Sequence, residues 1–143
     1  RQDNSYEFYI VGSKPTEQVE ALASIQGVIV TGRVDDVRPY VKYALLSVAP
    51  LRIARGIQNK VLEAMAMGKT VVATQNAVEG IDLPEEIKNL VSDSVDGQVQ
   101  KIKQLNDTAH RQELEIISSQ WIIDHYSWEK TLKPLSQLIR KKG

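Results

Sequence analysis

Short apolar runs alternate along the chain with longer segments that mix apolar and polar residues. The runs are rich in β-branched and aromatic residues, which predicts short strands buried on both faces, as in the middle of a parallel sheet. The expected strands are "YEFYIVGS" (6–13), "VIVTG" (28–32), "LLSVAP" (45–50), "TVVATQ" (70–75) and "KNLVSDS" (88–94).

The segments between these runs carry apolar residues at helical spacing. In the first segment Thr16 is the expected N-cap and Gly27 the expected stop. In the second, Pro39 is tolerated because it falls near the first turn. The expected helices occupy residues 14–27, 34–44, 57–68, 95–105, 108–125 and the stretch after "YSW" (126–128).

Strand, helix, strand, helix is the pattern of an α/β fold in which helices wrap a parallel sheet. Right-handed crossovers point the strands the same way, so the loops that follow them lie on one edge, where open α/β folds bind ligands. We expect a Rossmann-like sheet with one such rim of loops. The rim consists of Gly12-Ser13-Lys14, Gly32-Arg33-Val34, Pro50 to Gly56, Thr74 to Gly80, and Ser92-Asp93-Ser94.

Composition narrows the function classes. A length of 143 residues fits one domain, and residues 1–143 are predicted to form one. The 18 basic and 18 acidic residues balance, which gives no electrostatic case for nucleic acid or an acidic membrane. The absence of Cys excludes disulfides and fits a reducing compartment. The longest apolar run, near 44–51, is far below the roughly 18 residues of a membrane span.

The beginning of the chain suggests a piece of something longer. Arg1 stands where an initiator Met would, and a strand follows almost at once.

The loop before the helix at 57–68 is the leading candidate site. Arg52, Arg55 and Lys60 surround a helix N-terminus, whose free N–H groups and partial positive charge bind anions. Gly56 removes the side chain where a phosphate would approach the backbone. The cations suit phosphate. Alternatively they solvate a surface loop, and the loop alone favours that interpretation.

Glu63 favours a nucleotide instead. It is an acid in "VLEAMAMG", a segment otherwise made to be buried, and Asn59 shares its face of the helix. A carboxylate would repel phosphate but can accept hydrogen bonds from a ribose diol. The pattern therefore predicts a clamp, with the helix N-terminus on phosphate and the acid on ribose. The alternative is an exposed Lys60–Glu63 pair, worth only a few tenths of a kcal/mol.

Four stretches together resemble the C-terminal, nucleotide-sugar-binding domain of family 4 (group 1) glycosyltransferases, which have the GT-B fold. They are "FYIVGS" (8–13), "VTGRVDDVRPYVKYALLSVAPLR" (30–52), "GIQNKVLEAMAMGKTVVAT" (56–74) and "YSWEKTLKPLSQLI" (126–139). The resemblance covers nearly the whole chain, and its densest part, 49–80, is similar to sugar transferases of exopolysaccharide clusters. It implies the C-terminal half of a GT-B fold, truncated at its N-terminal edge, without the acceptor-binding domain.

The resemblance also implies roles for single residues. The family motif of two glutamates separated by seven residues places its second acid, the ribose ligand, at Glu63. The first acid, beside the donor sugar, falls on Arg55, so this chain departs from the motif there. Arg55 and Glu63 are the candidate catalytic residues. The candidate nucleotide-sugar-binding residues are Gly12, Ser13, Gly32, Arg33, Val34, Arg52, Gly56, Asn59, Lys60, Glu63 and Glu79.

Partners and location follow from the same resemblance. Family 4 enzymes retain the anomeric configuration, need no bound metal in general, and work in a cleft between two domains. The implied partners are a nucleoside diphosphate sugar and the chain's own N-terminal domain, with no cofactor. A cytoplasmic location is expected, with the whole enzyme at the inner face of the membrane. Asp35 and Asp36 are adjacent rather than an Asp-x-Asp metal pattern, and they suit a helix start.

Two other function classes stay open. A GT-B sugar-nucleotide epimerase needs an acid–base pair in the cleft, and the sequence offers no obvious one. A non-enzymatic doubly wound module of receiver type needs acids at the strand ends, where this chain has Gly12-Ser13 and Ser47-Val48. A flavodoxin-type module would bind flavin.

The histidines and the aromatic residues near the chain end are expected to be structural. His110 and His125 have no partners at metal-ligand spacing and are expected on helix surfaces. Trp121, Tyr126 and Trp128 are expected to pack the last helices onto the sheet.

Overall fold

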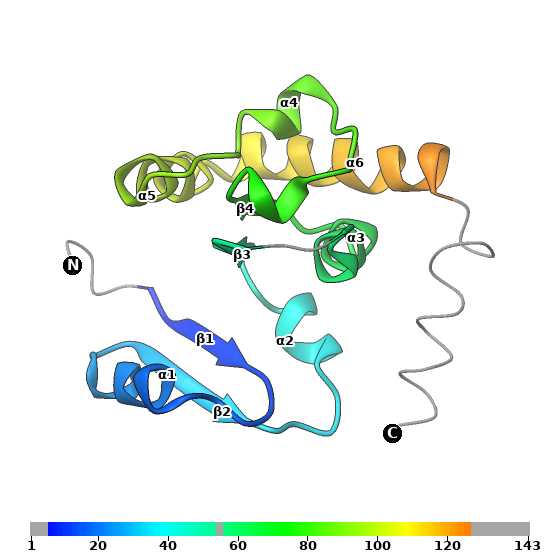
Figure 1. Cartoon of the computed structure of the whole chain (residues 1–143). Coiled ribbons are helices and arrows are strands. Elements are labelled where there is room, and N and C mark those ends of the chain that lie inside the picture. The colour runs from blue at the N-terminus through cyan, green and yellow to red at the C-terminus, as the bar shows by residue number, and fades with distance from the viewer. Residues whose placement is uncertain (1–5, 54–55, 127–143) are drawn as a thin grey trace. The chain divides into compact units, whose positions relative to one another are not determined.

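The structure, a computed structural model, describes residues 6–53 and 56–126 (Figure 1). The chain divides between Tyr43 and Ala44 into two compact units. Each unit contains one pair of parallel strands together with helices. The predicted α/β class, with parallel strands flanked by helices, is therefore confirmed.

The first unit is a parallel strand pair connected by a helical crossover. Strands β1 (Phe8–Val11) and β2 (Val28–Gly32) pair so that Phe8 lies opposite Val28. Helix α1 (Glu17–Ala21) and the 3₁₀ turn η1 (Leu22–Ser24) connect them. Helix α2 (Arg38–Lys42) follows β2 and has Pro39 in its first turn, as predicted, but it begins four residues after the predicted start at 34, with Val37 as its N-cap.

Thr16 caps α1, as the sequence predicts. Its Oγ1 accepts a hydrogen bond from the Val19 N–H at 3.3 Å. The helix ends at Ala21, well before Gly27, so the predicted end of the helix was too late.

Strand β1 is confirmed as a strand, but the prediction that it is buried on both faces is wrong. Phe8 is 44% exposed and Tyr9 is 45% exposed. Tyr9 contacts the ring of Tyr40 in α2, with 6.0 Å between the centroids. Two strands and two five-residue helices offer too little surface to cover both faces of a strand.

The second unit contains the strand pair β3 (Ser47–Ala49) and β4 (Val71–Ala73), with helix α3 (Asn59–Ala66) between them in the chain. The strands are parallel, with Ser47 opposite Val71. The predicted helices at 95–105 and 108–125 are confirmed. The remaining elements are η2 (Asn76–Val78), α4 (Glu85–Lys88), α5 (Val95–Gln104) and α6 (Thr108–His125).

The predicted fifth strand at 88–94 is wrong in extent. Helix α4 runs to Lys88, and only an isolated parallel bridge joins Val91 to Ala73. Ile87 and Leu90 are buried at 2% and 3% exposure, and their spacing of three residues places them on one face of a helical turn. These residues are apolar because they form the buried face of a helical turn. A short apolar run in the sequence is compatible with either such a turn or a strand.

Packing in the core of the second unit holds α3 in place. Helix α6 packs against α3 and α4 (Figure 1). The most deeply buried residues of this core come from α3, β4, α6 and the turn before α6. They include Leu62, Met65, Val72, Leu105, Leu114 and Ile122. In the first unit no described side chain is fully buried. No helix within 6–53 or 56–126 is long and apolar enough to cross a membrane.

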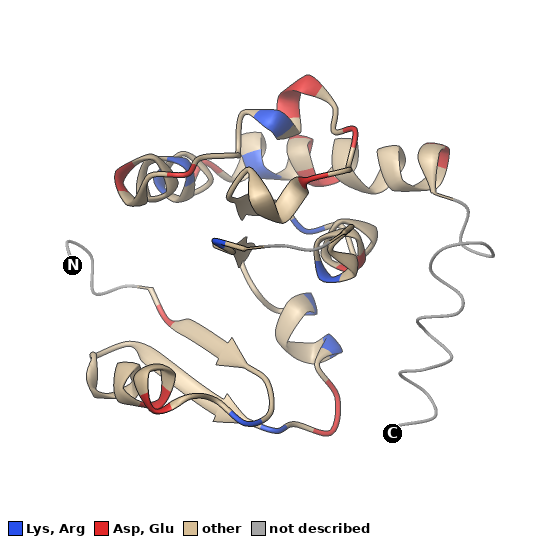
Figure 2. Ribbon diagram, viewed as in Figure 1, with Lys and Arg blue, Asp and Glu red and all other residues tan. Residues whose placement is uncertain are grey.

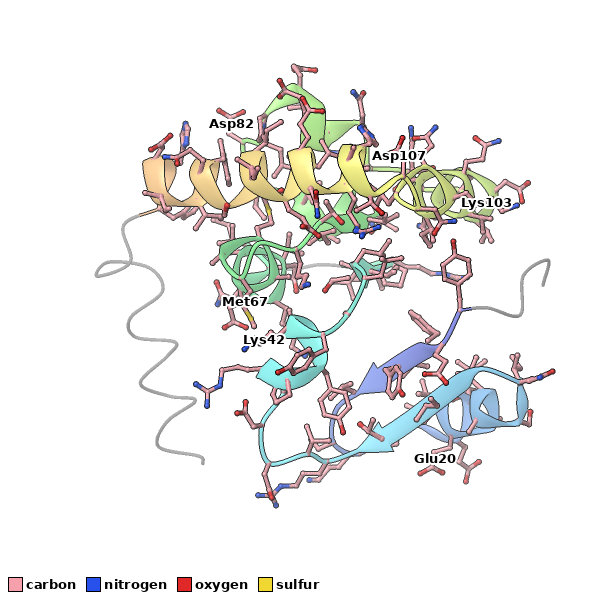
Figure 3. The ribbon with its side chains drawn as sticks, turned by 180° about the vertical axis from the view of Figure 1, so that it is seen from behind. Glu20, Lys42, Met67, Asp82, Lys103 and Asp107 are labelled. Atoms are coloured by element: carbon pink, nitrogen blue, oxygen red, sulfur yellow. The ribbon has the colours of Figure 1, made fainter. Side chains whose placement is uncertain are left out.

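Asp107 caps α6, and its loss is expected to destabilise the second unit. The Asp107 Oδ1 accepts a hydrogen bond from the His110 N–H at 3.2 Å (Figure 3). Asp107→Ala should cost about 0.5–2 kcal/mol, and thermal unfolding should show a melting temperature lower by about 2–4 °C for each kcal/mol lost. Glu113→Ala is the matched control, since it removes an exposed acid from the same helix. Equal melting temperatures for the two variants would contradict the capping role.

Candidate functional site

The predicted site residues fall into two groups, one in each unit. In the first unit the loops after β1 and β2 adjoin, because the Gly12 N–H donates to the Gly32 carbonyl at 3.3 Å. This is the arrangement expected at the carboxyl ends of parallel strands. Ser13 and Arg33 are exposed there and Val34 is half-buried.

The second group surrounds the beginning of α3. Arg55 lies outside the described residues, and Arg52, Asn59 and Lys60 are exposed. Helix α3 begins at Asn59, two residues later than predicted, because Gln58 has an extended backbone and is the N-cap. The Gln58 side chain does not cap the helix; its Nε2 donates to the Gly56 carbonyl at 3.5 Å.

Residues 56–60, which we call the helix mouth, are open to an anion. Across the described residues, the N–H groups of Asn59 and Lys60 have no acceptor, and no acid stands in the first turn. Gly56 has φ +74°, a conformation that favours glycine, and no described atom lies within 4 Å of the place where a Cβ would be. Free N–H groups and the helix dipole together make the helix mouth electropositive.

Glu63 is a half-buried acid without a protein partner in the described part of the chain. Among residues 6–53 and 56–126, its carboxylate accepts no hydrogen bond and joins no ion pair, so the alternative of a Lys60–Glu63 pair is not formed, and Asn59 does not bond to it. Burial raises the pKa of Glu63 above its usual value, opposed in part by the charge of Lys60. Withdrawing a carboxylate from water without a hydrogen-bond partner costs free energy. Such a carboxylate is typical of a ligand-binding site.

Two residues that the sequence did not single out hold the loop after β3. The Thr74 hydroxyl donates to the Leu51 carbonyl at 2.5 Å, and the Asn76 side-chain amide donates to the Arg52 carbonyl. Both belong to the loop after β4, residues 74–80. The one sequence signal is a hydroxyl and an amide directly after a strand, and that pattern fits many loops.

Two further contacts complete the rim in the second unit. Gly80, at φ +80°, lies so close to the helix mouth that an added Cβ would be 3.3 Å from Ile57 Cγ1. The Asp93 carboxylate accepts a hydrogen bond from the Gln75 N–H at 2.8 Å. Glu79 is exposed beside Gly80. The loops after β3, after β4 and around Asp93 therefore meet, as predicted from the parallel strands.

A small pocket beside this rim contains none of the predicted site residues. Its volume is about 130 Å³, and its lining residues are Gln75, Val78, Ile81, Leu83, Lys88 and Val91. Lys88 is paired with Glu85 at 3.1 Å. The pocket therefore has four apolar side chains beside a glutamine and a cation that already has a partner.

Other charged groups are dispersed or paired. Figure 2 shows basic and acidic residues interspersed along the ribbon. The Asp36 carboxylate accepts hydrogen bonds from Arg38 Nε and Nη2, both at 2.9 Å, and from the Arg38 N–H, and these bonds lower the pKa of Asp36. In residues 6–53 and 56–126, no group of three or more His, Asp or Glu could hold a metal ion.

The aromatic residues at the end of α6 pack against one another, and their predicted packing onto the sheet stays a prediction. Trp121 is buried, and His125 stacks on it with 4.9 Å between the ring centroids. The ring of Tyr126 lies against the same indole at 5.3 Å. Trp128 lies outside the described residues.

The comparison with protein families decides the class. The model of glycosyl transferases group 1 matches residues 1–108, which is most of the chain. The chain belongs to this family. The resemblance read from "GIQNKVLEAMAMGKTVVAT" is thereby confirmed. Comparison with curated proteins finds no match.

The crystal structure of TarM has a fold similar to that of this group 1 glycosyltransferase chain. The TM-score is 0.75 at 21% sequence identity, over 96% of this chain and 29% of that chain. At such identity the likeness concerns the fold alone. This chain therefore spans less than a third of the length of that protein.

Proposed function

We propose that the chain is the donor-binding domain of a retaining glycosyltransferase. In this proposal it holds a nucleoside diphosphate sugar, and an N-terminal domain supplies a saccharide or lipid-linked acceptor. Membership in the group 1 family supports the reaction class. The observation that carries the location of the site is Glu63, a half-buried carboxylate without a partner among the described residues, on the helix whose mouth is open.

The diphosphate is proposed to bind at the helix mouth. Gly56 lets phosphate oxygens approach the backbone, and the N–H groups of Asn59 and Lys60 have no acceptor among the described residues. Arg52 and Lys60 add positive charge. During sugar transfer the leaving nucleoside diphosphate accumulates negative charge, and fixed donors and cations stabilise that charge. The proposal needs no metal and no cofactor.

Glu63 is proposed to accept hydrogen bonds from the ribose hydroxyls. The resemblance assigns the base to Gly32, Arg33 and Val34, and that assignment stays a prediction, as do the roles of Gly12, Ser13 and Glu79. Arg55 replaces the acid that the family sets beside the donor sugar, so the sugar is expected to be held differently in this protein. A place in exopolysaccharide synthesis at the inner face of the membrane is part of the same proposal.

Nucleoside diphosphates are expected to stabilise the protein. UDP, GDP and ADP are compared in a thermal-shift titration, and one of them should raise the melting temperature, since a ligand at a hundred times its Kd adds about 2.7 kcal/mol. The matching nucleoside without phosphates is the control and should have a much smaller effect. If no diphosphate at millimolar concentration shifts the transition, the proposed site is wrong.

Product analysis separates transfer from epimerisation. The 143-residue chain alone is expected to transfer no sugar from a labelled sugar nucleotide, because the proposal assigns acceptor binding to a separate N-terminal domain. Conversion of the labelled sugar nucleotide to an epimer would favour the alternative enzyme class.

A further inference from the structure

Hydrogen bonds beyond those of the β3–β4 strand pairing join the loop after β4 to the loop after β3. Thr74 is 7% exposed, and its hydroxyl both donates to the Leu51 carbonyl at 2.5 Å and accepts from the Ala77 N–H at 3.3 Å. The Thr74 N–H donates to the Ala49 carbonyl at 3.1 Å. The Asn76 side-chain amide donates a hydrogen bond to the carbonyl of the next residue, Arg52.

These hydrogen bonds determine which groups of the loop after β3 can face an anion. A carbonyl oxygen that faced a phosphate would repel it, and the carbonyls of Leu51 and Arg52 are both occupied by donors. The Arg52 side chain is exposed and projects from a backbone that is held in place. A loop ordered before binding loses less conformational entropy when a ligand arrives.

The same loop also contacts the other side of the helix mouth. Gly80 approaches Ile57, so that a Cβ added at position 80 would lie 3.3 Å from Ile57 Cγ1. Residues 74–80 therefore contact the candidate phosphate site at two places, at the carbonyls of Leu51 and Arg52 and at Ile57 within the helix mouth.

We propose that Thr74 and Asn76 are positioning residues for the diphosphate site. They keep the backbone at Leu51 and Arg52 in the arrangement in which the arginine and the helix mouth meet a pyrophosphate group together. The proposal rests on the proposed function, and it adds two residues outside the predicted binding set. Neither of them needs to touch the substrate.

The test uses two readouts on four variants. Thr74→Val removes the hydroxyl at nearly constant shape, Thr74→Ser keeps it, and Asn76→Ala removes the amide. Asn89→Ala is the matched control, because Asn89 is exposed at the end of α4 and its side chain makes no hydrogen bond in the described part of the chain. The readouts are the initial rate of tryptic cleavage after Arg52, followed by mass spectrometry, and the Kd of inorganic pyrophosphate in EDTA, from calorimetry.

Thr74→Val and Asn76→Ala are each expected to speed cleavage after Arg52 and to weaken pyrophosphate binding, both by about two- to tenfold, the range for one lost hydrogen bond. Thr74→Ser and Asn89→Ala should match the unsubstituted protein. Asn76 is exposed, so its variant is expected to stay folded even if Thr74→Val does not.

An unchanged value of either readout in Asn76→Ala would overturn the inference. Faster cleavage with constant pyrophosphate affinity would mean that the contacts are merely structural, and weaker binding with constant cleavage would mean that they do not act through the loop. If the unsubstituted protein bound no pyrophosphate, the proposed function itself would fail, and the inference with it.

Discussion

Glu63→Gln is expected to weaken nucleoside diphosphate binding by roughly ten- to a hundredfold, as for loss of a charge-assisted bond of about 1–3 kcal/mol. The amide keeps the shape of the side chain but loses the carboxylate that would accept both ribose hydroxyls. Inorganic pyrophosphate has no ribose and is repelled by a carboxylate, so its affinity should not fall. Calorimetric titration of both ligands against both proteins measures the two effects side by side.

The same substitution is expected to stabilise the unliganded protein at pH 7. Burial raises the pKa of Glu63, so the folded state holds this proton more tightly than the unfolded state does. The stability from this group is therefore present below the ordinary glutamate pKa, 4.5, and is lost as pH rises through the raised value. Glutamine imitates the protonated form at every pH.

The expected stability gain is small but has a distinct pH profile. Glu63→Gln should raise the melting temperature at pH 7, and the difference should vanish below about pH 4.5. Glu113→Gln, at an exposed position of α6, should show neither effect. Unaltered nucleotide affinity in Glu63→Gln would remove the ribose assignment, and a lower melting temperature at pH 7 would show that the carboxylate has a partner in the folded chain.

Leu62→Ala is expected to cost about 2–5 kcal/mol of unfolding free energy. Leu62 is fully buried, at 0% exposure, in the core that α3 shares with β4 and α6. Its truncation removes apolar burial and leaves a cavity. A loss of that size is a large part of the 5–15 kcal/mol that stabilises a typical domain, and urea unfolding followed by circular dichroism measures it.

Met67→Ala is the control at the other end of the same helix. Met67 is 38% exposed and lies on the side of α3 away from α6 (Figure 3). Its truncation should change the unfolding free energy by about 0.5 kcal/mol or less. Similar losses for the two variants would contradict the packing described for α3.

Local signals in the sequence predicted the elements well. The Thr16 cap depends on a residue three positions away, so a single stretch of sequence contains what is needed. The beginning of α2 was predicted four residues too early, since the helix begins at Arg38. The error at 88–94 arose where a short apolar run was compatible with either a strand or a helical turn. The burial of β1 depends on what surrounds it, which its apolar pattern does not specify.

The sequence predicted the candidate site only where its residues are close together in the chain. Gly56 and Glu63 belong to one helix and its entry, and the sequence pointed to both. The roles of Thr74 and Asn76 depend on carbonyls 23 and 24 positions earlier in the chain. A backbone acceptor has no signature in the sequence, so these contacts could not be anticipated. Arg55 lies outside the described residues, and its departure from the family motif stays a prediction.

The bonds from Thr74 and Asn76 end on main-chain oxygens, so they impose no requirement on which side chains stand at positions 51 and 52. The backbone path of the loop after β3 is therefore independent of which side chains it carries. Under the proposed function, a library randomised at positions 51 to 53 is expected to change which donor the loop prefers, while Thr74 and Asn76 on another segment preserve its course. The scaffold for new specificity lies outside the segment that would be diversified.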